Sequence, residues 1–177
     1  MLSAVLTASA HLPAGFSVSA PVPAGQQPDP SSHTIYPDMA VAQSSPYRLS
    51  KNFGKRIAVF GGSLSVANES DAAKQIWANL LGAEVVTYGV GGAGFSRDQG
   101  YTIQRQVDSA GIFDIYVLWA STNDFNGVRE CGTWKDYTEF DGYDPEKLST
   151  QCGGINYCIK ALGQTSGGLI LQIMLSN

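Results

Sequence analysis

The stretch IAVFGGSLSV, Ile57 to Val66, decides the fold that this sequence predicts. Its first residues are strand formers that stop at two glycines, which is typical of a buried strand. Ser63 follows at once, on a sharp turn where its hydroxyl can face solvent beside the free N–H groups of a following helix. A serine in this position is also a common turn or N-cap residue. The segment alone favours that structural role.

Strand and helix patterns alternate from Lys55 onward. Further strands are expected over residues 84–88, 113–120 and 169–175, and helices over residues 73–81, 103–110 and 155–162. Gly82 is placed to end the first helix. Continuous apolar strands that alternate with helices indicate a parallel sheet covered on both faces. The predicted fold class is therefore α/β, with three layers (α/β/α) around a doubly wound parallel sheet.

The two ends of the sequence differ from this central pattern. Residues 1–50, rich in Pro, Ser, Ala and Gln, are predicted to be a leader and extended linker, and residues 51–177 one domain. The sequence stops just after a strand, so we expect a C-terminally incomplete fragment whose sheet lacks its last strand and helix.

The first ten residues, MLSAVLTASA, resemble the apolar part of a secretory signal peptide without its basic front. A mobile apolar N-terminus explains them equally well. We expect a secreted or periplasmic protein, with a cytoplasmic location as the alternative.

Composition excludes several classes of partner. The 177 residues are 44% hydrophobic and 15% charged, with a formal net charge of −4, so the basic surface that nucleic-acid binding needs is missing. No apolar run approaches the roughly 18 residues of a membrane span.

The cysteines, Cys131, Cys152 and Cys158, match no zinc spacing, so no metal is expected. Their odd number allows one bridge, such as Cys131–Cys152, or free buried thiols.

Two more segments follow predicted strands, and the carboxyl ends of parallel strands are where such folds build their sites. GVGGAGF (residues 89–95) satisfies the dinucleotide pattern G-x-G-x-x-G, but it follows the second strand of the domain rather than the first. The acidic residue expected about 20 positions later is also missing. STND (residues 121–124) adds the Asn123 amide, which can donate to an oxyanion or form a turn with Asp124.

Together and in this order, the three segments resemble the SGNH (GDSL-like) esterase/lipase superfamily. The resemblance covers residues 55–177. FGGSLS resembles the family's first block, which makes Ser63 the nucleophile. TYGVGGAGF places Gly92 at the glycine whose N–H binds the oxyanion, and STND resembles the GxND block with Asn123 as the amide donor. The resemblance implies a flavodoxin-like three-layer fold and serine esterase chemistry with no cofactor.

The sequence departs from the family's pattern at three places. Gly62 stands where the first block has Asp, and Ser121 stands where the third block has Gly. The D-x-x-H block, which supplies the general base, is absent. The histidines His11 and His33 both precede the first predicted strand, in the linker-like segment. A base must come within hydrogen-bond reach of its nucleophile, so the histidine is expected beyond residue 177 or the chain is inactive.

The resemblance implies hydrolysis of an acyl ester, in which the N–H groups of Ser63 and Gly92 and the Asn123 amide bind the oxyanion. Asp124, Phe125 and Trp134 are candidate substrate contacts. Aromatic residues between Phe125 and Thr150 favour a carbohydrate ester as substrate, although they could also pack the segment onto the domain. Two alternative interpretations of the function stay open. One is a catalytically inactive domain that binds a carbohydrate or partner, and the other is a Rossmann-like nucleotide-binding domain.

Overall fold

The computed structural model describes residues 33–66, 71–96, 102–119, 121–126, 129–166 and 168–173, so the predicted signal-like segment lies outside the described residues. The strands are β1 (His33–Ile35), β2 (Arg56–Phe60), β3 (Glu84–Thr87), β4 (Ile115–Trp119) and β5 (Leu169–Ile173). The α-helices are α1 (Met39–Ser44), α2 (Asp71–Leu81), α3 (Ile103–Ser109), α4 (Asn123–Asn126) and α5 (Gln151–Ser166). Short 3₁₀ helices are η1 (Ser63–Ser65), η2 (Glu139–Asp141) and η3 (Pro145–Ser149).

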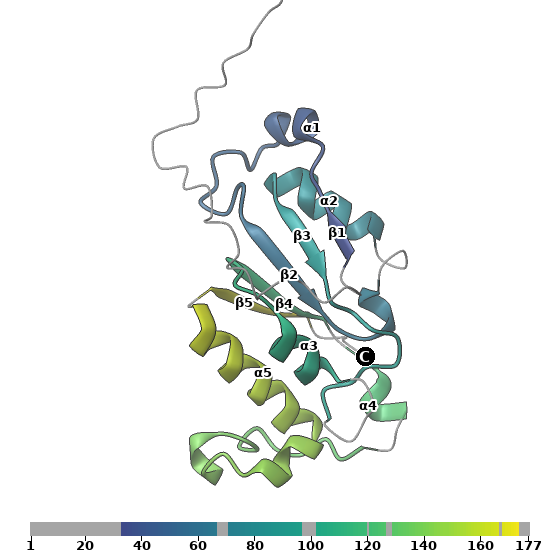
Figure 1. Ribbon diagram of the computed structural model, residues 1–177, viewed down its shortest axis with the longest axis vertical. Helices are drawn as coiled ribbons and strands as arrows, with labels where there is room; N and C mark the ends of the chain where they lie inside the picture. The colour runs from purple at the N-terminus through teal and green to yellow at the C-terminus, as the bar shows by residue number, and fades with distance from the viewer. Residues whose placement is uncertain are drawn as a thin grey trace, which may run out of the picture.

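The strands form a five-stranded sheet in the order β1-β3-β2-β4-β5, with β2 at its centre (Figure 1). The strand pairs β2–β3, β2–β4 and β4–β5 are parallel. From β2 at the centre, the chain adds β3 on one side and then adds β4 and β5 on the other. This is the doubly wound order that the sequence predicts, and the predicted α/β class is confirmed.

The sheet is mixed rather than wholly parallel, because β1 pairs antiparallel with β3. This strand and α1 lie in the segment that the sequence predicts as extended linker. Both are bound to the domain: the Asp38 N–H donates to Asn79 Oδ1 at 2.8 Å, and the Ser45 hydroxyl donates to the Leu80 carbonyl. The prediction was wrong for residues 33–50 because a three-residue strand and a six-residue helix are too short to show a period.

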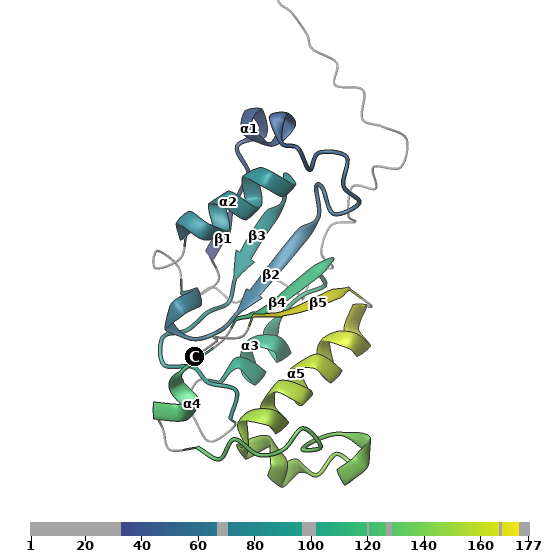
Figure 2. The same cartoon turned by 180° about the vertical axis from the view of Figure 1, so that it is seen from behind.

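Helices cover the two faces of the sheet unequally (Figures 1 and 2). Helices α3 and α5 pack on one face, where the buried cluster contains Phe60, Tyr88, Tyr116, Ile103 and Cys158, among others. Helix α2 packs on the other face, where the cluster contains Ile35, Val59, Ala78, Val85 and Val117, among others. Three layers result, as predicted. Gly82 ends α2 with a left-handed φ of 57° and packs against the Phe53 ring.

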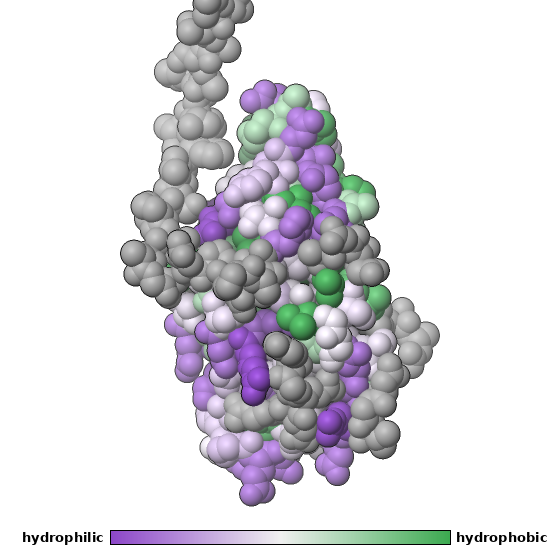
Figure 3. Space-filling model, turned by 45° about the vertical axis from the view of Figure 1, so that its right-hand side comes forward, coloured by the Kyte–Doolittle hydropathy of each residue, from purple (hydrophilic) through white to green (hydrophobic). Residues whose placement is uncertain are grey.

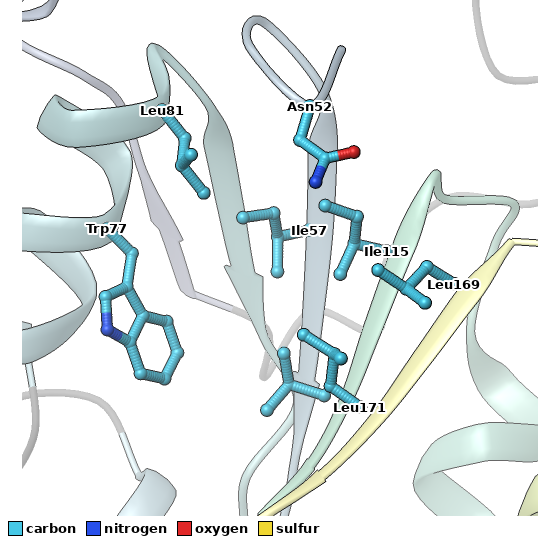
Figure 4. Close-up of a pocket in the computed structure, with 8 residues that line it drawn as sticks. Asn52, Ile57, Trp77, Leu81, Ile115, Leu169 and Leu171 are labelled. Carbon is cyan, nitrogen blue, oxygen red and sulfur yellow. The ribbon is translucent and has the colours of Figure 1, made fainter. Parts of the chain in front are cut away.

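Because α2 covers only part of its face, an apolar groove of about 250 Å³ remains between this helix and β5 (Figure 4). Trp77 and Leu81 of α2 form one side, and Leu169 and Leu171 of β5 form the other. On the face in Figure 3, hydrophobic residues form small patches among hydrophilic ones. Within the described ranges, no helix has both the length and the apolar character to cross a membrane.

The buried charged side chains include a lysine. Lys74 of α2 is fully buried, and its ammonium donates to the carbonyl oxygens of Ser65 at 3.2 Å and Val66 at 3.3 Å. It also donates to Thr87 Oγ1 at 3.1 Å and pairs with Asp71 at 3.1 Å. A buried charge is tolerated only when it is paired and hydrogen-bonded in this way. Lys74 thus joins α2 and β3 to the turn that follows β2.

We predict that Lys74→Met lowers the free energy of unfolding by about 3 kcal/mol, because two carbonyls and one carboxylate lose their buried partner. Urea denaturation measures the change. Lys51→Met removes an exposed lysine and is the matched control, with an expected effect below about 0.5 kcal/mol. Equal stability of the two variants would contradict the structural role of Lys74.

Candidate active site

The three predicted catalytic residues follow the carboxyl ends of neighbouring parallel strands. Ser63 begins η1 after β2, Gly92 lies in the loop after β3, and Asn123 begins α4 after β4. Strands β3 and β4 flank β2 on its two sides, so the three loops meet at one edge of the sheet. Figure 2 shows the turn after β2 and helix α4 at this edge.

The loops touch at Gly62. A Cβ atom at this position would lie 2.7 Å from the Ala93 carbonyl oxygen, 2.7 Å from Asn123 Nδ2 and 2.9 Å from Ser121 Oγ. Such distances leave no room for a side chain, so the backbone before Ser63 packs directly on the other two loops. The structure therefore brings together the three segments that carry Ser63, Gly92 and Asn123.

The Ser63 hydroxyl is exposed, and among the described residues no hydrogen-bond partner is found for it. The backbone before it is fixed by a buried side chain. The Gln106 amide of α3 accepts from the Gly61 N–H at 2.9 Å and donates to the Gly61 carbonyl at 3.0 Å. After Ser63, the Ser65 hydroxyl donates to the Gly62 carbonyl at 2.9 Å. A free hydroxyl on a fixed turn is the arrangement that a nucleophile needs.

Gly92 is exposed and has a φ of 82°, in the left-handed region that favours glycine. A Cβ atom there would meet nothing within 4 Å, so backbone conformation rather than space requires the glycine. Within the described part of the chain, no acceptor is found for the Gly92 N–H, although the next residue donates to the Val90 carbonyl at 3.1 Å. A backbone donor is therefore presented to solvent at the site edge.

The Asn123 amide lies at the junction but is engaged by its neighbours. Its Nδ2 donates to the Ala93 carbonyl at 2.8 Å and to Ser121 Oγ at 3.0 Å. The Ser121 hydroxyl itself donates to the Ala93 carbonyl at 2.7 Å. To donate to an oxyanion, the amide would have to give up its contact with Ser121. Two of the three departures from the SGNH pattern, Gly62 and Ser121, also lie together, because the Ser121 hydroxyl lies where a side chain at Gly62 would extend.

Asp124 is buried, and its carboxylate points into the protein rather than toward a substrate. Its two oxygens accept from the N–H groups of Phe95 and Ser96, each at 2.9 Å. Asp124 therefore binds the glycine-rich loop, which is the loop after β3 with the sequence GVGGAGF (residues 89–95), to α4. This is a positioning role, and it differs from the predicted substrate contact. Sequence alone could not show which way this side chain points.

The two aromatic candidates are exposed in different places. Phe125 is 69% exposed in α4, directly after the site segment. Trp134 is 64% exposed, but it packs edge-on against Phe140 with ring centroids 5.3 Å apart. The Trp134 carbonyl accepts from Asn156, in the second turn of α5, at 3.1 Å. Phe125 thus lies in the same short helix as Asn123, whereas Trp134 lies along α5.

His33 does not lie in a linker: it belongs to β1, where its Nε2 is 3.4 Å from Asp71 Oδ2. Strand β3 separates β1 from β2, the strand that leads to Ser63, and the side-chain contact found for His33 is with Asp71. In the described ranges, no group of His, Cys, Asp and Glu side chains could hold a metal ion.

Sequence reasoning missed the buried supports of the site, Gln106 and Lys74. Each is a polar residue on the buried face of its helix, and Gln106 lies beside the apolar Val107. A polar residue at such a position is the available signal, because it has to find a partner inside the protein.

We predict that Asp124→Asn lowers the free energy of unfolding by about 2–3 kcal/mol, because an amide cannot accept from two N–H groups with both of its ends. Hydrogen exchange at the Phe95 and Ser96 amides is expected to become at least about tenfold faster. Glu139→Gln, at an exposed position, is the control. Unchanged protection of both amides would contradict the assigned role.

No protein-family model matches the sequence, and the search of curated proteins gives no match. Solved structures do match. A "putative GDSL-like lipase" from Bacteroides uniformis superimposes with a TM-score of 0.58 and 15% identity, over 75% of this chain and 76% of that one. Another from Bacteroides ovatus gives 0.54 and 18%, over 70% and 74%.

A "possible lipase" from Chitinophaga pinensis gives a TM-score of 0.50 at 19% identity, over 67% of this chain and 47% of that one. A further matched structure is covered over 56% of its length. The chain thus spans about half to three quarters of the length of the structures it matches. At these identities the likeness concerns the fold, and the chain has the α/β fold of the GDSL-like lipases.

Proposed function

We propose that this protein is a serine esterase that hydrolyses an acyl ester with Ser63 as its nucleophile. The observation that carries the proposal is the packing at Gly62, where the loops bearing Ser63, Gly92 and Asn123 meet within van der Waals distance. The free Ser63 hydroxyl and the exposed backbone at Gly92 give this junction a nucleophile and a donor. The fold shared with GDSL-like lipases supports the same reaction class.

In the proposed reaction, Ser63 Oγ attacks the ester carbonyl and forms a tetrahedral intermediate. The N–H groups of Ser63 and Gly92 would donate to the oxyanion, and the Asn123 amide would join them by exchanging its contact with Ser121. One preorganised donor of this kind lowers the barrier by roughly 3–4 kcal/mol. The acyl-enzyme is then hydrolysed by water, and no cofactor is needed.

The proton of Ser63 needs an acceptor, and the proposal assigns a histidine outside the described residues. His33 does not fill this role because it faces Asp71 from the edge strand. A histidine base would take the proton during attack and return it to the leaving alcohol. The fold places the remaining strand end, that of β5, at the same edge of the sheet as the other three loops.

For the substrate we propose a carbohydrate ester, since exposed aromatic rings stack on sugar faces. Phe125 is the candidate nearest to Asn123 in the chain, and Trp134 would belong to a more distant subsite along α5. We further propose that the protein acts outside the cytoplasm, which rests on the signal-like start of the sequence.

The contacts of the glycine-rich loop count against nucleotide binding. A dinucleotide fingerprint leads straight into a helix and leaves N–H groups free for the pyrophosphate. Here α3 begins only at Ile103, and the Asp124 carboxylate already accepts from Phe95 and Ser96. A buried negative charge at this place would repel a phosphate.

We predict that Ser63→Ala in the natural full-length protein reduces the turnover of p-nitrophenyl acetate at least about 10³-fold, because the nucleophile is lost. Asn123→Ala is expected to lower kcat about 10²–10³-fold. Ser44→Ala, which changes an exposed serine in α1, is the control and should keep full activity.

Retained turnover in Ser63→Ala would refute the proposal. A folded wild-type protein with no turnover and no labelling by a fluorophosphonate probe would also refute it. That second result would favour a non-catalytic binding domain on the same fold.

A further inference from the structure

Two of the three cysteines lie side by side although about 20 residues separate them in the chain. The Cys152 N–H donates to the Cys131 carbonyl at 2.9 Å, and the neighbouring Gln151 N–H donates to the Glu130 carbonyl at 3.0 Å. With standard bond lengths, one backbone hydrogen bond of this kind holds the two Cα atoms roughly 5–6 Å apart. That separation lies within the range of roughly 4.4–6.8 Å that a disulfide spans.

The side chains are near each other as well, because the Cys131 thiol is one of the groups that raise the pKa of Cys152. All three cysteines are free thiols in this structure, with Cys131 exposed, Cys152 half-buried and Cys158 buried. We propose that Cys131 and Cys152 form a disulfide bond that anchors the segment after α4 to the start of α5. This inference is independent of the proposed esterase activity.

Buried contacts on both sides of the pair fix the two segments. The Asp136 carboxylate accepts from the Thr133 hydroxyl at 2.8 Å and from the Thr150 hydroxyl at 2.8 Å. Burial opposes the charge of Asp136, but these hydrogen bonds outweigh it and lower the pKa of the carboxyl group. Thr133 follows Cys131 and Thr150 precedes Cys152 by two residues each, so the approach of the cysteines is set by the fold.

Glutathione disulfide would oxidise the two cysteines. The Cys131 thiolate attacks one of its sulfurs, which forms a mixed disulfide and releases one glutathione thiolate. The Cys152 thiolate then attacks Cys131 Sγ, which forms the protein disulfide and releases the second glutathione. The two cysteines lose two protons and two electrons in total, and glutathione disulfide takes them up as two thiols.

The three thiols differ in accessibility in the way this reaction requires. Cys131 is exposed, so its thiolate can reach glutathione disulfide and attack first. Burial and the neighbouring Cys131 raise the pKa of Cys152 to about 11, so its thiolate, and the rate of ring closure, should increase with pH. Cys158 is fully buried in the core between the sheet and α5, and burial raises the pKa of its thiol still further. Cys158 should therefore remain free.

The bond would act on the loop of the candidate site through α5. Gly154, two residues after Cys152, packs so closely on the Phe95 carbonyl that a Cβ atom would overlap it. The Gln104 amide joins the same carbonyl at 2.6 Å to the Leu148 carbonyl at 3.1 Å. A disulfide at the start of α5 therefore restrains the support of the glycine-rich loop.

The experiment equilibrates the reduced protein with glutathione disulfide, unfolds it in the presence of iodoacetamide and maps its tryptic peptides by mass spectrometry. Cleavage after Arg129, Lys135, Lys147 and Lys160 places Cys131 in peptide 130–135 and the other two cysteines in peptide 148–160. We expect these peptides to be cross-linked, with fragment ions that place the bond at Cys152 and the alkyl group at Cys158. The initial rate should rise about tenfold per pH unit between about pH 7 and 8.5.

Cys152→Ser should remove the cross-link, and Cys158→Ser should keep it. The oxidised wild-type protein is expected to have a Tm roughly 5–10 °C above that of the reduced protein, with no such difference in Cys152→Ser. Three alkylated cysteines after equilibration, or a bond between Cys131 and Cys158, would overturn the proposal. A cross-linked protein with a lower Tm than the reduced one would overturn it too, because the native positions would then not accommodate the bond.

Discussion

The loops of the candidate site can meet only because residue 62 is a glycine. Three loops from three adjacent parallel strands share one small volume, and a side chain at residue 62 would collide with the Ala93 carbonyl, the Asn123 amide and the Ser121 hydroxyl. A parallel, doubly wound sheet brings these loops to one edge, and the absence of a side chain lets their backbones touch. The exposed hydroxyl of Ser63 follows directly from this arrangement.

Buried polar side chains of the helices stabilise the packing of these loops. Gln106 pairs with both backbone groups of Gly61, Asp124 accepts from the loop after β3, and Lys74 binds the end of η1. Burying such polar groups is costly unless they are fully hydrogen-bonded. Each of these side chains therefore holds the backbone groups that it contacts in one conformation. Helices α2 and α3 thus fix the turn that carries Ser63, and α4 fixes the loop after β3 beside it, while the Ser63 hydroxyl has no partner among the described residues.

Much of this architecture could be predicted from the sequence, because long apolar runs and helical periods reflect burial directly. The strands of the parallel sheet, helix α2 and its end at Gly82 were all predicted within a few residues. Strand β1 and helix α1 were not, because their few residues show no period. The sequence shows that Asp124 directly follows Asn123. Only the three-dimensional contacts show that the Asp124 carboxylate points inward and that Trp134 lies along α5.

We propose that Ser63, Gly92 and Asn123 act on one reacting carbonyl. A crystal structure of the natural full-length protein treated with an alkyl fluorophosphonate is the decisive measurement. We expect a phosphonyl group covalently bound to Ser63 Oγ, with one of its oxygens about 3 Å from the Gly92 nitrogen and from Asn123 Nδ2. A phosphonyl group on another residue, or one whose oxygens all point away from Gly92 and Asn123, would refute the proposed site.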